Sequence, residues 1–390
     1  MITLLLQPIG LFLIFLTCLS QDQVPEIFLE PIITVNFGDA TADKPQSKSW
    51  THAGQSWLVV ADGAGPVLWK KEDSKWRAQS SVNTLWKGQP NKADVYVHGD
   101  DAHVLLVGAC ALKVAHLRYS KAKGQYIHEG IATLPMPAGC REIETATITH
   151  DSHGRYWVAS DWNESILVWH SADGATWSAP QPLAQDIDAD DISLVVSLKD
   201  QISVIWSNQK TESMMERVHM DRDPVNSWSK PIVIEQGDKN ADDHLNATVF
   251  EDGSMALVTK NSVDQVHQPQ FVFRYRSPSG NWSNIPYQAL VEPQQPSRPI
   301  INHIRNGRIY AMHSVKDRSN GLYHISVNEV TRNNENWEFK ELVRLKTHTT
   351  GKNGDLTSSK SAFSASDPYL IFFSDDLGHV FEYDLKRLKE

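Results

Sequence analysis

The most chemically suggestive local pattern in the chain is an acidic pair followed directly by a histidine. Asp242, Asp243 and His244 are consecutive, and Asn246 follows two residues later. An imidazole titrates near neutrality, and a neighbouring carboxylate can orient it, so such a group can act as a general base. The pattern therefore predicts a proton-transfer site with His244 as the base and Asp243 as its partner. The alternative is that these side chains only make hydrogen bonds between neighbouring structural units.

Other acidic residues could supply a second kind of chemistry. Asp190 and Asp191 end an acidic segment, residues 185–191, and Asp161 stands directly before Trp162. Two carboxylates that face each other across a site can hydrolyse a glycosidic bond, and the ring of Trp162 could stack on a sugar. The alternating carboxylates of residues 185–191 could instead bind Ca²⁺, but their spacing does not fit an EF-hand loop and a solvated acidic loop explains them better. We expect no other cofactor and no metal site.

Elimination from a uronic-acid polysaccharide is the competing reaction. It needs a base, a cation that stabilises the enolate and an acid for the leaving oxygen. His244 can be the base, Arg298 or Lys260 the cation, and Tyr310 the acid. The residue types alone do not rank elimination against hydrolysis.

The elements that must position these residues follow from an internal repeat. An aromatic residue recurs at intervals of 50 to 55 residues, each time before a short apolar run, at Trp76, Tyr126, Trp177, Trp228, Trp282 and Trp337. Between these positions lie pairs of alternating strands joined by tight turns such as Asp252-Gly253 and Asn306-Gly307. Seven such hairpins, with four short strands per repeat and no amphipathic helix, predict an all-β, seven-bladed β-propeller. A β-sandwich with an additional domain fits the regular spacing less well.

The last repeat supplies only three strands before the chain ends. Residues 30–37 form an additional β-type segment before the first hairpin. We therefore expect this N-terminal strand to close the last blade, which removes two free sheet edges. The expected domain organisation is a signal peptide over residues 1–20 and a single propeller over residues 21–390.

Propeller geometry gathers the candidate residues on one face. The residue that opens each innermost strand lies on the same face as the end of the second strand. The strand openings include Asp190, Asp191, Asp243, His244, Arg298 and Lys360, and the second-strand ends include Asp161, Asn208, Lys260 and His313. Concave sites with convergent polar groups are the usual ligand sites, so we expect catalysis and substrate binding at this central funnel.

One turn carries a family resemblance. The segment Ser171-Ala-Asp173-Gly174-Ala-Thr176-Trp177 resembles the Asp-box, or BNR repeat, of sialidase-like propellers, with one residue fewer between Asp and Gly. The resemblance implies a fold shared by sialidases, other exo-glycosidases, ulvan-type polysaccharide lyases and lectins, and the motif itself is a folding motif. A sialidase would carry three substrate-binding arginines, and apart from Arg298 the strand openings lack them. The resemblance therefore implies a carbohydrate-active protein, a lyase or a glycoside hydrolase, or alternatively a non-catalytic glycan- or protein-binding propeller.

Composition and the N-terminus predict where the protein works. Residues 1–20 are uncharged and largely apolar, which is typical of a secretory signal, although Cys18 also permits a lipoprotein anchor. Export would leave Cys110 and Cys140, which we expect to form a disulfide, with two free thiols as the alternative. The net charge of −10 argues against nucleic acid as a partner. We expect a secreted or periplasmic monomer without a transmembrane segment, acting on an extracellular glycan.

Overall fold

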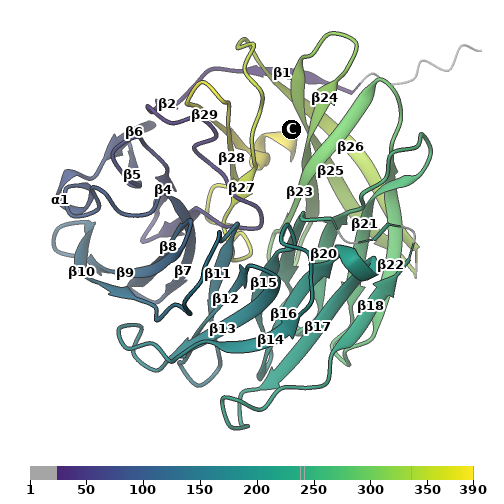
Figure 1. Cartoon of the computed structure of the whole chain (residues 1–390). Helices are drawn as coiled ribbons and strands as arrows, with labels where there is room; N and C mark the ends of the chain where they lie inside the picture. Colours follow the sequence, from purple (N-terminus) through teal and green to yellow (C-terminus); the bar gives the residue numbers. More distant parts are fainter. Residues whose placement is uncertain (1–23, 238, 241, 335, 390) are drawn as a thin grey trace, which may run out of the picture.

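The computed structural model describes residues 24–237, 239–240, 242–334 and 336–389, so the expected signal peptide over residues 1–20 lies outside the described residues. Seven sheets, six of four strands and one of five, stand around a common axis (Figure 1). The innermost strands of neighbouring blades contact one another around the ring. The predicted seven-bladed β-propeller is thereby confirmed.

Each blade runs outwards from the axis in sequence order. Blade one contains β3 (Ser49–His52), β4 (Gln55–Val60), β5 (Val67–Glu72) and β6 (Lys75–Ala78). Blade two contains β7 (Lys92–His98), β8 (Asp101–Gly108), β9 (Ala111–Ser120) and β10 (Gln125–Thr133). Blade three contains β11 (Ala146–His150), β12 (Tyr156–Trp162), β13 (Ser165–Ser171) and β14 (Gln181–Gln185). Blade four contains β15 (Ser193–Leu198), β16 (Gln201–Asn208), β17 (Ser213–Met220) and β18 (Ile232–Gln236).

The remaining blades complete the ring. Blade five contains β19 (Leu245–Val249), β20 (Met255–Lys260), β21 (Pro269–Arg276) and β22 (Trp282–Ala289). Blade six contains β23 (Gln294–His303), β24 (Ile309–Asp317), β25 (Tyr323–Asn333) and β26 (Asn336–Thr347). Blade seven contains β27 (Thr357–Ser358), β28 (Leu370–Ser374) and β29 (His379–Asp384). The helical elements are short: α1 (Ser80–Asn83) and the 3₁₀ turns η1 (Gln209–Thr211) and η2 (Leu385–Lys389).

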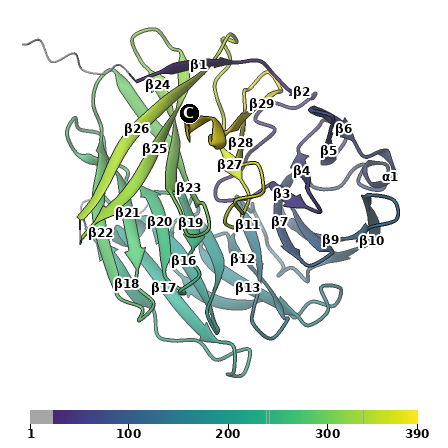
Figure 2. The ribbon, with the colours of Figure 1, turned by 180° about the vertical axis from the view of Figure 1, so that it is seen from behind.

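The N-terminal segment closes the ring, as the sequence predicted. Strand β2 (Ile33–Thr34) pairs antiparallel with β29 as the outermost strand of blade seven. At the neighbouring turn, a side chain at Gly378 would place its Cβ 2.2 Å from the carbonyl oxygen of Val35, so only glycine permits this approach. Strand β1 (Glu26–Leu29) adds a feature the sequence did not predict, because it pairs parallel with β26 as a fifth strand of blade six (Figure 2).

The core lies between the blades rather than at a single centre. Blades two and three share one buried apolar cluster, which includes Leu105, Ile148 and Trp169. Trp177, one of the recurring aromatics, belongs to the same cluster, and its indole donates a 3.2 Å hydrogen bond to the carbonyl of Gly174. No helix among the described residues is long and apolar enough to cross a membrane.

Candidate functional site

The segment between β2 and β3 crosses one face of the ring and reaches its centre. The Gln46 side-chain amide donates to the carbonyl of Ala146 at the start of β11 (3.0 Å). The Asn246 amide on β19 donates to the carbonyl of Pro45 (3.2 Å). These bonds tie residues 44–46 to blades three and five. They hold Lys44 on the face at which β11, β15 and β19 begin, which we call the entry face.

Three carboxylates meet on the entry face. Glu144, Asp190 and Asp243 precede β11, β15 and β19 respectively, and each offers an oxygen within 4.8 Å of the others. The Lys44 ammonium lies 3.0 Å from Oε1 of Glu144 and also bonds the Asp243 carboxylate. One cation therefore faces a group of three acids that come from three successive blades.

A cavity of about 530 Å³ opens beside this group. Its charged lining is mostly acidic: Asp43, Glu142, Glu144, Asp188 and Asp190 face two cations, Lys92 and Arg141. Lys92 is already paired, since its Nζ lies 2.6 Å from Oδ2 of Asp43. The cavity is large enough for a small ligand.

Burial and mutual repulsion raise the pKa of two acids of the site. Burial, helped by the charge of Asp243 and opposed by Lys44, raises the pKa of Glu144 to about 8. Burial and the Asp243 charge also raise the pKa of Asp190. Asp243 keeps its ion pair with Lys44. Glu144 is therefore a carboxylic acid that still holds its proton near neutral pH.

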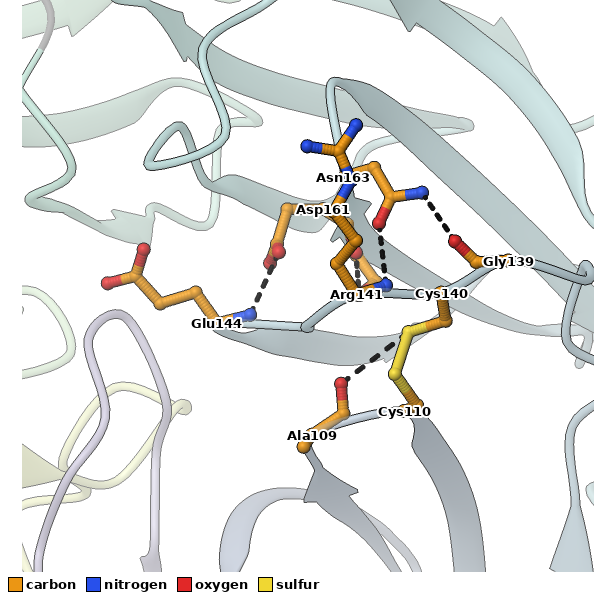
Figure 3. The surroundings of a disulfide bond; sticks show 9 residues. Ala109, Cys110, Gly139, Cys140, Arg141, Glu144, Asp161 and Asn163 are labelled. Carbon is orange, nitrogen blue, oxygen red and sulfur yellow. Dashed lines mark hydrogen bonds between the residues drawn. A yellow bond between two sulfur atoms is a disulfide. The ribbon is translucent and has the colours of Figure 1, made fainter.

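The backbone that carries Glu144 is held by Asp161, a residue predicted to be catalytic. Its carboxylate accepts hydrogen bonds from the backbone N–H of Glu144 (2.8 Å) and of Thr145 (2.9 Å), as Figure 3 shows for Glu144. Asp161 is 1% exposed, and burial raises its pKa to about 7. These contacts give Asp161 a positioning role.

A disulfide and an asparagine hold the beginning of the segment 139–145, which carries Glu144. Cys110, in the turn between β8 and β9, is bonded to Cys140 in the segment before β11 (Figure 3). The Asn163 side chain accepts from the backbone N–H of Arg141 (2.9 Å) and donates to the carbonyl of Gly139 (3.1 Å). The cavity-lining residues 141–144 are thus fixed at both ends.

The predicted His244 site lies next to the three carboxylates. Nδ1 of His244 is 2.5 Å from carboxylate oxygens of both Asp242 and Asp243. Lys260 lies 2.6 Å from the other oxygen of Asp242. The hydrogen bond from His244 and the charge of Lys260 outweigh burial and hold the pKa of Asp242 well below its usual range. The structure brings His244, Asp243 and Lys260 together, but the His244 side chain is only 8% exposed.

Three other predicted site residues stabilise the structure around them. Asp191 is buried and accepts from the backbone N–H groups of Asp188 (2.7 Å) and Gln209 (3.0 Å), so it braces the loop that presents Asp190. Asn208 caps η1. Trp162 packs against the apolar cluster of blades two and three.

Four other predicted site residues are paired or buried outside this group of three acids, although the charge of Asp243 still acts on Arg298. Arg298, in a bulge of β23, pairs with Asp355 at 2.6 Å. Lys360 follows β27 instead of opening an inner strand, and it bonds the Asp94 carboxylate on β7 and the Ile148 carbonyl on β11. His313 is not at a strand end, because β24 continues to Asp317. It is buried between blades five and six against Phe271. Tyr310 is fully buried.

The site also contains two residues that sequence reasoning did not identify. Glu144 stands two positions before Ala146, the first residue of β11, and it was not among the residues expected at the strand openings. Lys44 lies in a segment between strands, where the repeat carries no information. Only the three-dimensional path of residues 38–48 places its ammonium at the centre.

Carboxylate oxygens are the ligands that Ca²⁺ prefers, and Glu144, Asp190 and Asp243 could be considered for that role. The Lys44 ammonium already lies between two of them. A divalent cation would have to displace this lysine, so the donor set fits a metal poorly as it stands. Ca²⁺ binding at residues 185–191 stays a prediction.

No protein-family model matches the chain, and no curated protein matches its sequence. Solved structures do resemble it in fold. A polysaccharide lyase of family PL25, an ulvan lyase bound to -[GlcA(1-4)Rha3S]-, superposes with a TM-score of 0.58 at 12% identity, over 92% of this chain and 99% of that one. The polysaccharide lyase Uly1 gives a TM-score of 0.52 at 12% identity, over 91% and 98% of the two chains. At these identities the likeness concerns the seven-bladed architecture, which this chain shares with both lyases.

Proposed function

We propose that this protein is a glycan-active enzyme that hydrolyses glycosidic bonds in the cavity lined by Glu144 and Asp190. The observation that carries the proposal is the pair itself: an acid with a pKa raised to about 8 and a second carboxylate within 4.8 Å of it. Glycoside hydrolases use such a pair, in which one carboxyl group is protonated and the other is ionised.

In the proposed reaction, Glu144 donates its proton to the glycosidic oxygen while the bond from that oxygen to the anomeric carbon breaks. The Asp190 carboxylate attacks the anomeric carbon and forms a glycosyl ester. Glu144, now ionised, removes a proton from water, and that water releases the sugar and restores Asp190. Retaining enzymes place their carboxyl groups about 5–5.5 Å apart and inverting ones about 6.5–9.5 Å apart. Because an oxygen of Glu144 and one of Asp190 lie within 4.8 Å, we propose the retaining route.

Lys44 and Asp243 set the charge of the pair. Asp243 is ion-paired with Lys44, and its negative charge raises the pKa of both Glu144 and Asp190. Lys44 opposes that rise at Glu144. We assign Lys44 and Asp243 an electrostatic role behind the pair, and His244 a role in holding Asp243 through its Nδ1 contact.

The charge of the cavity favours a neutral glycan and hydrolysis over elimination from a uronate. Elimination needs a free cation for the substrate carboxylate, and the candidates Lys260 and Arg298 are paired with Asp242 and Asp355. The acidic lining would also repel a polyuronate. Elimination remains the second candidate, because the solved structures that share this fold include lyases and one of them holds a uronate-containing ligand.

We further propose that the enzyme works outside the cytoplasm as a monomer. The apolar N-terminal sequence and the Cys110–Cys140 disulfide support an oxidising compartment. A lipid anchor at Cys18 is the alternative to full release.

The test is a polysaccharide panel with neutral and uronate members, followed by reducing-end release and by absorbance at 235 nm. The proposal expects new reducing ends from a neutral glycan without absorbance growth. Absorbance growth on a polyuronate would establish the lyase instead. No product from any member would favour the non-catalytic binding propeller.

A further inference from the structure

A second cavity lies on the opposite face of the ring, between blades five and six. It measures about 380 Å³ and is lined by the turn from β19 to β20, the turn from β23 to β24, and the outer strands β21, β25 and β26. The inner strands β19 and β23 end at these turns, whereas the entry face lies where the inner strands begin. This cavity, which we call the rear cavity, is therefore separate from the candidate active site.

The rear cavity contains a buried polar atom without a partner. His303 is 2% exposed, and its Nδ1 makes a 2.8 Å hydrogen bond with the hydroxyl of Thr248. Its Nε2 has no hydrogen-bond partner among the described residues, and the Glu251 carboxylate remains 4.0 Å away. A buried ring nitrogen without a partner costs free energy, which a hydrogen bond from a ligand would offset.

Aromatic rings and a cation form the other wall. The Arg332 guanidinium lies 5.2 Å from the ring centre of Tyr275 and 5.3 Å from that of Trp337. The two rings hold the Arg332 guanidinium, and no ion pair joins it to a carboxylate among the described residues, so its donors remain available to a ligand. Trp337 is one of the recurring aromatics, yet it is only partly buried and lines the cavity.

The mixture of groups identifies the class of ligand. Arg332 supplies donors, Glu251 and Asp252 supply acceptors, and Trp337 and Tyr275 supply apolar ring surface. Glu251 also pairs with Arg305, whose Nε lies 3.3 Å from its Oε1. An anion would meet two carboxylates, and a purely apolar ligand would leave the polar groups unpaired. A sugar hydroxyl can donate or accept, so it satisfies Nε2 of His303 in either tautomer.

We propose that the rear cavity is a second, non-catalytic binding site for a neutral sugar residue. It would hold a glycan chain on the face away from the candidate active site. Two sites on one rigid ring raise the effective concentration of a polymer at each of them. The rear site does not depend on the proposed hydrolysis, because a chain that cannot hydrolyse glycans would still bind there.

The test uses the full mature chain with the additional changes Glu144→Gln and Asp190→Asn, which prevent turnover. The probes are cellohexaose, xylohexaose, mannohexaose and laminarihexaose, followed by saturation-transfer NMR and calorimetry. Trp337→Ala and, separately, the exposed Arg332→Ala should each weaken the binding of at least one probe by about tenfold or abolish it.

Arg318→Ala is the matched control, because Arg318 lies at the other end of the same blade, in an exposed pair with Glu292. Binding should survive this change, and melting curves should show that all variants are folded. The proposal is overturned if no probe binds the parent chain. Arg332 is exposed, so its replacement should not disturb folding. The proposal is therefore also overturned if the Arg332→Ala chain binds every probe as tightly as the parent chain does.

Discussion

The carboxylate of Asp161 accepts a 2.8 Å hydrogen bond from the backbone N–H of Glu144. This bond joins the end of β12 to the residue that precedes β11 by two positions, and a bond of 2.9 Å from Thr145 reinforces it. A fully buried acid thus fixes the backbone of a partly exposed acid that faces the cavity. In the proposed reaction, Asp161 would position Glu144 and Glu144 would donate the proton.

Replacing Asp161 with asparagine should therefore damage both stability and rate. The amide can accept only one of the two backbone N–H groups well, so we expect a loss of about 1–3 kcal/mol in the free energy of unfolding. We also expect the rate of reducing-end release to fall by about tenfold to a hundredfold, because small misplacements of a catalytic group are costly. Denaturant melts and initial rates measure the two effects. An unchanged rate in a folded Asp161→Asn chain would contradict the positioning role.

The protonation of Glu144 predicts how stability depends on pH. The native state keeps this proton up to a pKa of about 8, whereas the unfolded chain loses it near the ordinary glutamate value. Between these two values the native state binds more protons, so its stability falls as pH rises. The Asp161 carboxyl, with a pKa of about 7, acts in the same direction. Glu144→Gln should flatten this slope, and Glu129→Gln, at an exposed position on β10, should leave it unchanged. Equal slopes in wild type and Glu144→Gln would show that Glu144 is ionised throughout.

Removal of the Lys44 charge should disturb both acids. In Lys44→Met, Asp243 and Glu144 lose their shared cation, and we expect about 2–4 kcal/mol of destabilisation near pH 8, less at pH 5 where protonation relieves the repulsion. Lys210→Met is the matched control, because Lys210 pairs with exposed Glu164 and Asp186 at the surface and should matter by less than about 1 kcal/mol. Thermal melts at both pH values test this. The account of Lys44 is wrong if the two variants behave alike.

The disulfide should stabilise the chain and hold the active-site segment. A bridge across a sequence separation of 30 residues is worth about 3–4 kcal/mol in the chain-entropy estimate. The double variant Cys110→Ala, Cys140→Ala should lose about this much stability and part of its activity, because Arg141 and Glu144 follow Cys140 directly. Reducing agent should lower the melting temperature of the wild type and leave that of the double variant unchanged. A wild type that is indifferent to reducing agent would show that the bridge is absent in solution.

The fold could be predicted because the structural repeat of the blades is also a repeat in the sequence. Alternating strands, tight turns and an aromatic at intervals of 50 to 55 residues specify blades, and the missing strand of the last blade indicated the closure by β2. The additional strand β1 could not be predicted, because it pairs parallel with β26 and no tight turn in the sequence joins the two strands.

The site could be predicted only in part, for reasons of geometry. Asp190 and Asp243 were found because they open inner strands, and the structure brings them together. His313 was misplaced because strand ends are poorly marked in sequence, and β24 runs four residues further. Lys44 could not be predicted as a site residue, because its position depends on the path of a segment that has no repeat pattern.

The central claim is that Glu144 and Asp190 form the acid and nucleophile of a retaining glycoside hydrolase. The most direct measurement is the initial rate of reducing-end release from the best neutral glycan, compared among wild type, Glu144→Gln, Asp190→Asn and Glu129→Gln. NMR of the first product should accompany it. We expect a loss of about 10²–10⁴ in each of the first two variants, no loss in the Glu129 variant, and a product whose anomeric configuration is retained. Full activity in folded Glu144→Gln or Asp190→Asn chains would contradict the claim.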